Sequence, residues 1–186
     1  MCIKISRTVF DTPKDVVFTG CYVPPENSPY YDNLTMKDGV QALEECLMEV
    51  LGNEEHYMVL CGDLNARTGS SQPVMNDDSC DMVPFSFDAH DVMVDRRTKD
   101  IGVNNFGFSL LNLCIAVDGV ILNGFCDDDR AGEFTYVSPH GSSLIDYFIV
   151  SEELLSRRLC LSVGDRIDSW HRPVFLAVSF KPSMVR

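Results

Sequence analysis

The sequence lacks any apolar run long enough to cross a membrane. None of its apolar segments approaches the roughly 18 continuous apolar residues of a transmembrane helix. The first residues, MCIKISRTVF, contain neither the long apolar run nor the small-residue cleavage site of a signal peptide. We therefore expect no membrane partner, and we expect an intracellular protein of the nucleus or cytoplasm.

Paired cysteine motifs are also missing. The eight cysteines are scattered, with no CxxC and no cysteine-histidine pair at zinc spacing. Most of them lie within apolar segments, which favours reduced core thiols over a disulfide framework.

Basic residues are scarce. The chain has 15 lysines and arginines against 28 acidic residues, for a net charge of -13. Such a balance weighs against strong nonspecific binding to a polyanion. It leaves room for a local basic patch, a cation-assisted phosphate site or an acidic interaction module.

The apolar content is sufficient for one core. With 186 residues and 45% hydrophobic content, the chain should form a single domain. Three- and four-residue apolar spacing predicts helices at 36–51 and 105–117. β-branched and aromatic runs predict strands at 16–23, 57–61, 120–123, 133–137, 144–150, 159–163 and 174–180. Strands outnumber helices in a mixed order, which indicates an α/β or α+β sandwich.

Residues 66–104 are rich in Ser, Asn, Asp and Pro and are only weakly periodic, which predicts a long surface excursion. Its end, Arg96-Arg97-Thr-Lys99, is the densest basic cluster of the chain. Two interpretations stay open for this cluster: a solvated loop and a set of phosphate contacts.

Asp63 and Asn65 directly follow the apolar strand 57–61. If the chain stays extended, alternation directs both side chains to the same side. A carboxylate can hold a cation or take a proton from water, and a carboxamide can donate to a phosphate oxygen, so the pair suits phosphoester chemistry. The alternative is that both residues only form a turn after Gly62.

Asp146 interrupts the apolar segment LIDYFIV, and His171 precedes the last strand. A charge buried in a strand is costly unless it is paired, and His171 offers a partner. The carboxylate would then hold the imidazole, which can face a phosphate. The alternative for His171 is a purely structural ring.

The order of these motifs resembles the endonuclease/exonuclease/phosphatase superfamily with the DNase I-like fold. Within it, the sequence is most similar to the apurinic-type endonuclease domain of non-LTR (LINE-type) retrotransposons. The segments that carry the resemblance are CYVPPENSPY (21–30), CGDLNA (61–66), RRTKD (96–100), GVILNG (119–124), GEFTY (132–136), SLIDYFIVS (143–151) and SWHRPV (169–174).

The resemblance implies a DNase I-like β-sandwich flanked by helices, spanning residues 1–186 as one domain whose N-terminal strands are missing. It further implies a magnesium-dependent endonuclease that acts on DNA. Tyr22 would contact the phosphate, Asp63 would activate water, and Asn65 would stabilise the transition state. Asp146 would orient His171, which would bind the scissile phosphate. Asp63 and Asn65 are the expected metal ligands.

Two departures from the family pattern predict weak or no activity. The strand that ends in the family's metal-binding Glu is not found in this sequence, and Trp170 replaces the Asp of the Ser-Asp-His motif. Asp168 could replace that acid only with a different loop geometry. The alternative function is a catalytically silent module that binds phosphate or a partner. An incomplete sheet would also leave an open edge for self-association or a partner chain.

Overall fold

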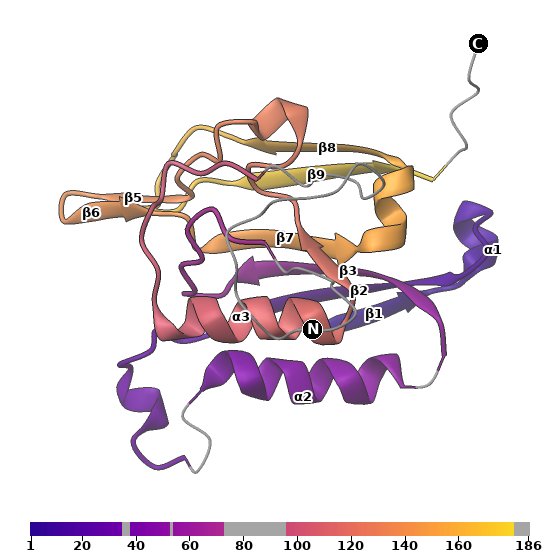
Figure 1. Cartoon of the computed structure of the whole chain (residues 1–186), viewed down its shortest axis with the longest axis horizontal. Coiled ribbons are helices and arrows are strands. Elements are labelled where there is room, and N and C mark those ends of the chain that lie inside the picture. Colours follow the sequence, from indigo (N-terminus) through magenta and orange to yellow (C-terminus); the bar gives the residue numbers. More distant parts are fainter. Residues whose placement is uncertain (35–37, 53, 73–95, 181–186) are drawn as a thin grey trace, which may run out of the picture.

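The computed structural model describes residues 1–34, 38–52, 54–72 and 96–180. Its central element is a five-stranded sheet in the order β1-β2-β3-β7-β4 (Figure 1). Only the β2–β3 pair is parallel; the other three pairs are antiparallel. The strands of this sheet are β1 (Cys2–Ile5), β2 (Asp15–Tyr22), β3 (His56–Asp63), β7 (Asp146–Ser151) and β4 (Gly119–Ile121).

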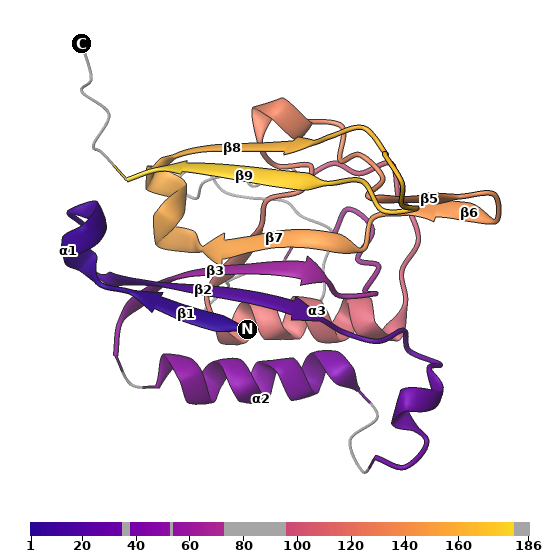
Figure 2. The same cartoon turned by 180° about the vertical axis from the view of Figure 1, so that it is seen from behind.

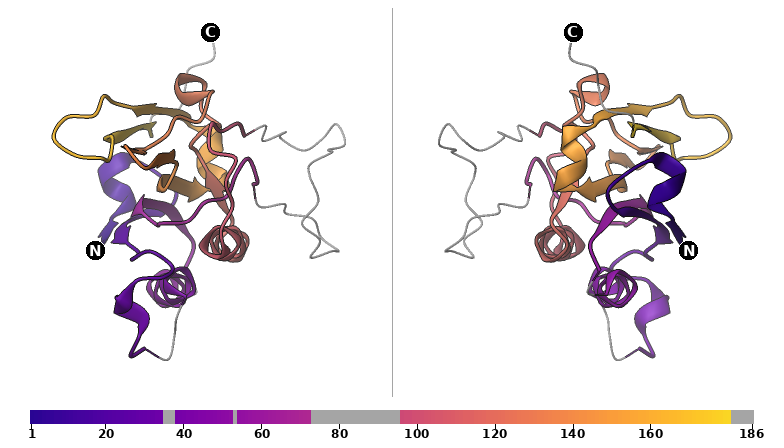
Figure 3. Two further views of the ribbon diagram at one scale, coloured as in Figure 1. Left: turned by 90° about the vertical axis from the view of Figure 1, so that its left-hand side faces the viewer. Right: turned by 90° about the vertical axis from the view of Figure 1, so that its right-hand side faces the viewer.

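Two helices cover one face of the central sheet. They are α2 (Gly39–Leu51) and α3 (Asn105–Ala116), and both are seen end-on in Figure 3. Side-chain caps fix their starts: Asp38 accepts from the N–H of Val40, and Asn104 accepts from the N–H of Gly107. The core on this side includes Leu47 of α2, Leu110 and Leu113 of α3, and Leu60 and Ile149 of the sheet.

The other face packs against the antiparallel hairpin of β8 (Arg158–Val163) and β9 (Val174–Ser179) (Figure 2). The core on this side joins Val59 and Val150 of the sheet to Leu161 of β8. The resulting arrangement is a sandwich of a helical layer, a central sheet and a second, smaller sheet. It confirms the expected α/β sandwich.

Shorter elements complete the described chain. A hairpin of β5 (Tyr136–Ser138) and β6 (Gly141–Ser143) projects at one end of the molecule. The short helix α1 (Arg7–Phe10) joins β1 to β2, and three 3-10 turns lie at Pro29–Tyr31, Asp127–Asp129 and Glu152–Ser156. No helix among the described residues is long and apolar enough to span a membrane.

The predicted helices and strands are present with small shifts at their ends. β1 and β6 were not predicted, because β1 is short and mostly exposed and β6 consists of Gly141-Ser-Ser143. The predicted strand 133–137 begins only at Tyr136. Within the described part of the chain, β1, β4, β8 and β9 each pair with one strand only, and an open edge left by missing strands stays a prediction. Self-association through such an edge stays a prediction.

The predicted surface excursion is wrong at its two flanks. Thr68, Gln72, Arg96 and Asp100 are buried there. Gln72 exchanges hydrogen bonds with the backbone of Ile121 in β4, so the flank is tied to the sheet edge. The polar composition predicted exposure to solvent, but these side chains are buried and form hydrogen bonds with other buried groups. Residues 73–95 of the excursion lie outside the described residues.

The cysteines agree in part with the prediction of reduced core thiols. All seven described cysteines are free thiols. Cys114 and Cys126 are buried, whereas Cys2 and Cys46 are exposed. Burial raises the pKa of the Cys114 thiol to about 12, which keeps it protonated and unreactive.

Candidate active site

Three neighbouring strands end or begin at the same edge of the central sheet with a polar side chain. Tyr22 ends β2 and is paired in register with Asp63, which ends β3. Asp63 is in turn paired with Asp146, which begins the antiparallel strand β7. Because paired residues share a face, all three side chains project toward the layer that contains β8 and β9.

Gly62 lets β2 and β3 approach each other beside this edge. Its φ is 141°, and a Cβ placed there would lie 1.8 Å from the carbonyl oxygen of Cys21. Any other residue would therefore push the two strands apart at the point where Tyr22 and Asp63 meet. The close approach of β2 and β3 therefore requires glycine at the first position of the Gly-Asp-x-Asn motif.

His171 reaches the site from the segment that connects β8 to β9. A backbone bridge to Tyr136 and the bond from the Arg172 N–H to the Thr135 carbonyl hold this segment against the start of β5. The His171 ring packs edge-on against Tyr136, with ring centroids 5.0 Å apart. Contacts on both sides of the residue therefore fix the direction of the imidazole.

The imidazole lies between the two carboxylates. Nδ1 of His171 is 3.0 and 3.1 Å from the two carboxylate oxygens of Asp146. Nε2 is 3.8 Å from Oδ2 of Asp63. In the neutral ring that donates from Nδ1, Nε2 can accept a proton, and in the protonated ring it can donate to a phosphate oxygen. The structure thus brings together the Asp146–His171 pair that the sequence predicted.

Asp63 is the most perturbed carboxylate of this edge. Burial and the neighbouring Asp146 carboxylate raise the pKa of Asp63 to about 6. The backbone N–H of Asn65, 3.1 Å away, and His171 act in the opposite direction. A carboxylate that titrates near neutral pH is suited to take a proton from water.

Asn65 lies beside this edge but does not continue the strand. β3 ends at Asp63, and Asn65 adopts a left-handed conformation with φ of 47°. Its side-chain N–H donates to the carbonyl of Val23 at 2.8 Å. The condition of an extended chain is therefore not met, because a turn separates the two side chains. The predicted role of Asn65 in the transition state stays a prediction.

Tyr22 is the exposed member of the group. Its side chain is 64% exposed, and it makes no side-chain hydrogen bond within the part of the chain that the structure describes. An exposed phenol at the edge of the site is available to a ligand, and the expected phosphate contact stays a prediction.

The residues at this edge fit a divalent cation. Asp63, Asp146 and His171 each offer a ligand atom, and these atoms lie within 4.8 Å of one another. A cation would relieve the repulsion and desolvation that raise the pKa of Asp63. Carboxylate oxygens suit magnesium, whereas an imidazole nitrogen also suits transition metals, so the donor set leaves the metal open. That Asn65 also binds the cation stays a prediction.

Two buried polar residues that no sequence rule singled out support Asp146. The hydroxyl of Thr135 accepts from the N–H of Ile145 and Asp146, at 3.1 and 3.0 Å. The amide of Asn123 donates to the carbonyl of Asp146 and accepts from the N–H of Phe148. Thr135 lies in the segment GEFTY and Asn123 in the segment GVILNG. The resemblance therefore pointed to both segments but did not predict that these side chains hold the backbone of Asp146.

Arg96 contradicts both open interpretations of the basic cluster, whereas exposed Lys99 agrees with a solvated loop. Arg96 is buried and donates to Thr68, to the carbonyl of Asn123 and to two carbonyls of the 69–71 turn. Lys99 pairs with Glu133. Arg96 stabilises the loops that it joins and is buried away from a phosphate, whereas Lys99 is an exposed cation beside one carboxylate.

The Ser-Trp-His segment presents an indole where an acid was expected. Trp170 is 47% exposed. Asp168 is exposed and is not a member of the cluster of Asp63, Asp146 and His171. Asp168 therefore does not take the place of the acid of the Ser-Asp-His motif.

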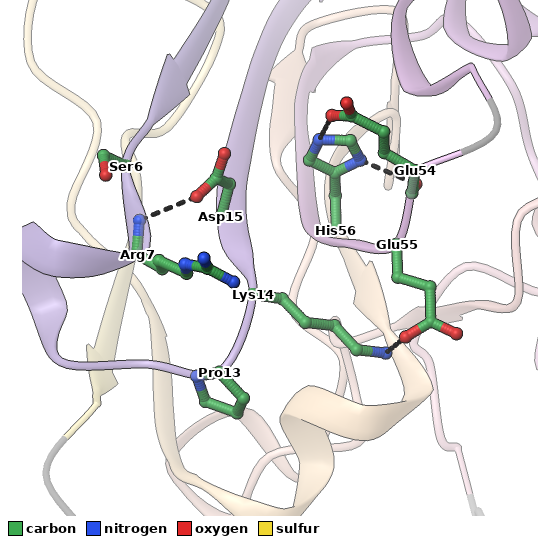
Figure 4. A pocket seen from close by; sticks show the side chains of 8 residues that line it. All are labelled: Ser6, Arg7, Pro13, Lys14, Asp15, Glu54, Glu55 and His56. Atoms are coloured by element: carbon green, nitrogen blue, oxygen red, sulfur yellow. Dashed lines mark hydrogen bonds and ion pairs between the residues drawn. The ribbon is translucent and has the colours of Figure 1, made fainter.

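A second polar hollow lies at the opposite ends of β2 and β3. Since β2 and β3 are parallel and eight residues long, it is about 23 Å from the edge with Asp63. Its charges are largely neutralised within the protein: Lys14 pairs with Glu55 and Glu153, and His56 with Glu54 (Figure 4). We assign it a structural role. Its lining residues are Ser6, Arg7, Pro13, Lys14, Asp15, Glu54, Glu55 and His56.

No protein-family model matches the sequence, and no curated protein matches it. Solved structures do match. The 3'-5' exonuclease NExo of Neisseria meningitidis is 14% identical with a TM-score of 0.56, covering 89% of this chain and 61% of that one. The AP endonuclease LMAP of Leishmania major is 16% identical with a TM-score of 0.54, covering 88% and 50%. The chain has the DNase I-like fold.

This DNase I-like chain also matches the endonuclease domain of TRAS1, a telomere-specific non-LTR retrotransposon. The identity is 12% and the TM-score 0.49, with 96% of this chain and 68% of that domain covered. The chain thus spans about half to two thirds of the length of these structures. At such low identities the likeness establishes the fold, and the activity must be argued from the site.

Proposed function

We propose that the chain is a divalent-cation-dependent phosphodiesterase that hydrolyses DNA phosphodiester bonds, with weak turnover by residues 1–186 alone. The observation that carries the proposal is the joint placement of Asp63, Asp146 and His171 at one sheet edge. Names of structural neighbours support DNA as the substrate class, since they include an exonuclease and an AP endonuclease.

Each group has a task in the attack of water on a phosphodiester. Asp63, whose carboxylate lies 3.8 Å from Nε2 of His171, orients the water and takes its proton. Asp146 holds the imidazole by Nδ1, so that Nε2 of His171 donates to a phosphate oxygen. The hydroxyl of exposed Tyr22 contacts the same phosphate. The side-chain amide of Asn65 stabilises the negative charge that develops on this phosphate in the transition state.

Asp63 and Asp146 would hold the cation through carboxylate oxygens, because His171, which donates from both ring nitrogens in this role, has no lone pair left for it. When bound, the cation supplies charge stabilisation for the phosphate and lowers the pKa of water. Weak turnover follows because Trp170 offers no carboxylate beside His171, and each lost group of this kind commonly costs about 3 to 4 kcal/mol in the transition state.

The test is nicking of supercoiled plasmid and cleavage of an oligonucleotide with one abasic site, in magnesium or manganese and in EDTA. We expect slow cleavage that needs the cation and falls by roughly two to three powers of ten in His171→Ala and in Asp63→Asn. Glu45→Gln, an exposed carboxylate on α2, is the matched control. Cleavage that survives EDTA or both substitutions contradicts the proposal.

The alternative is a module that binds a cation and phosphate without turnover. The observation that favours it is the indole of Trp170, exposed at the site where an acid was expected. Calorimetry separates the two functions. Cation binding that is lost in Asp63→Asn, combined with no cleavage in any metal, would favour the silent module over the hydrolase.

A further inference from the structure

Trp170 is the single tryptophan of the chain, and it directly precedes His171. Its indole is 47% exposed, although a large aromatic side chain normally gains from burial. Consecutive Cα atoms are about 3.8 Å apart, so the backbone of Trp170 adjoins that of His171 in the proposed active site.

The segment that presents the indole is held in place. The carbonyl of Trp170 accepts from the N–H of Val137 at 2.8 Å, and Nη1 of Arg166 donates to the carbonyl of Val137 at 3.2 Å. Cζ of Arg166 lies 4.7 Å from the centre of the indole ring, within the range of a cation-π contact. The indole and the Arg166 guanidinium thus form an exposed aromatic and cationic surface on the segment that also carries His171.

Three further cations of the described residues have acidic partners within the protein. Lys99 pairs with Glu133, Arg67 pairs with Asp100, and Arg172 contacts Glu133 and three backbone carbonyls. With a net charge of -13, the chain has little long-range attraction for a polyanion. Binding of a nucleic acid would then depend on contacts other than charge, and stacking of bases on aromatic rings is such a contact.

We propose that Trp170, supported by Arg166, stacks on an unpaired DNA base next to the phosphate that His171 contacts. The ligand is single-stranded DNA, because a base within a duplex has both faces covered by its neighbours. The inference rests on the proposed function for the phosphate site and adds a specificity contact that favours unpaired nucleotides.

Fluorescence of the unmodified protein tests the proposal directly. Excitation at the long-wavelength edge, where the six tyrosines do not absorb, restricts the emission to Trp170. The probes are decathymidylate and a decamer of abasic tetrahydrofuran phosphates with the same backbone charge, each added in EDTA and in magnesium. We expect decathymidylate to quench the emission and the abasic decamer to leave it unchanged. Equal responses to both probes, or none, overturn the stacking.

Binding affinity gives a second readout, measured by anisotropy of fluorescein-labelled versions of both probes. We expect Trp170→Ala to weaken binding of decathymidylate roughly 5- to 100-fold, Trp170→Phe to retain most of it, and neither to affect the abasic decamer. Ile167→Ala is the matched control, since Ile167 is an exposed apolar side chain of the same loop. Unchanged affinity in Trp170→Ala contradicts the proposal.

The two proposals fail in different ways. If decathymidylate binds and abasic DNA is cleaved, but the emission and the affinity do not depend on Trp170, only the stacking is wrong. If neither probe binds and no DNA is cleaved, both proposals fall.

Discussion

Replacing Asp63 with Asn should stabilise the folded protein while it removes activity. The Asp63 side chain is only 17% exposed and faces the Asp146 carboxylate. Its pKa is raised from 3.8 to about 6, so the folded state holds a proton more tightly than the unfolded chain. At about 1.4 kcal/mol per pKa unit, ionised Asp63 lowers the free energy of unfolding by about 3 kcal/mol at pH 7.

The sign of the pH dependence follows from the raised pKa. Well below pH 3.8 the group is protonated in both states, and the folded protein carries no penalty from it. As the pH rises from about 4 to about 6, the penalty grows, and above that range it is constant. The carboxamide introduced by Asp63→Asn is neutral at every pH, and its oxygen can still accept the hydrogen bond that the Asn65 N–H now donates to Asp63.

The assay is urea unfolding followed by circular dichroism at pH 4, 5, 6, 7 and 8 in EDTA. We expect Asp63→Asn to be more stable than the unmodified protein by about 1 to 3 kcal/mol at pH 7, with the difference shrinking toward pH 4. The control Asp168→Asn removes an exposed carboxylate and should change stability by less than about 0.5 kcal/mol. A variant that is less stable at pH 7, or a difference that does not depend on pH, would refute the reasoning.

Two further predictions concern residues that position the site. Thr135→Val leaves the buried N–H groups of Ile145 and Asp146 without their acceptor and should cost about 2 to 4 kcal/mol in urea unfolding, while Thr135→Ser keeps the hydroxyl and should cost far less. Asn104→Ala removes the N-cap of α3 together with the bonds to Arg67 and Asn65. It should lower the unfolding free energy by about 1 to 3 kcal/mol, and Asn104→Asp, which keeps the acceptor, should recover about half; equal losses would contradict the cap.

The sequence could predict much of the fold because its elements follow local rules. The period of the apolar residues defined α2 and α3, and short apolar runs defined β2, β3 and β7. The same rules failed for β1 and for Arg96. β1 is an exposed edge strand that depends on pairing with β2, and Arg96 is buried because distant carbonyl groups accept its hydrogen bonds.

Of the candidate site, the sequence by itself determined that Asp63 follows the apolar strand 57–61 and that Asp146 interrupts the apolar run 144–150, while Tyr22 was indicated by the resemblance alone. The structure places all three at strand termini. Only the tertiary structure decided that these termini meet. Strand register aligns the three residues across β2, β3 and β7, and a backbone bridge to Tyr136 brings His171 to them. The sequence left a turn at Asn65 open as an alternative, and the bond from the Asn65 amide to the distant Val23 carbonyl selects it. Such bonds between distant segments leave no periodic trace in the sequence.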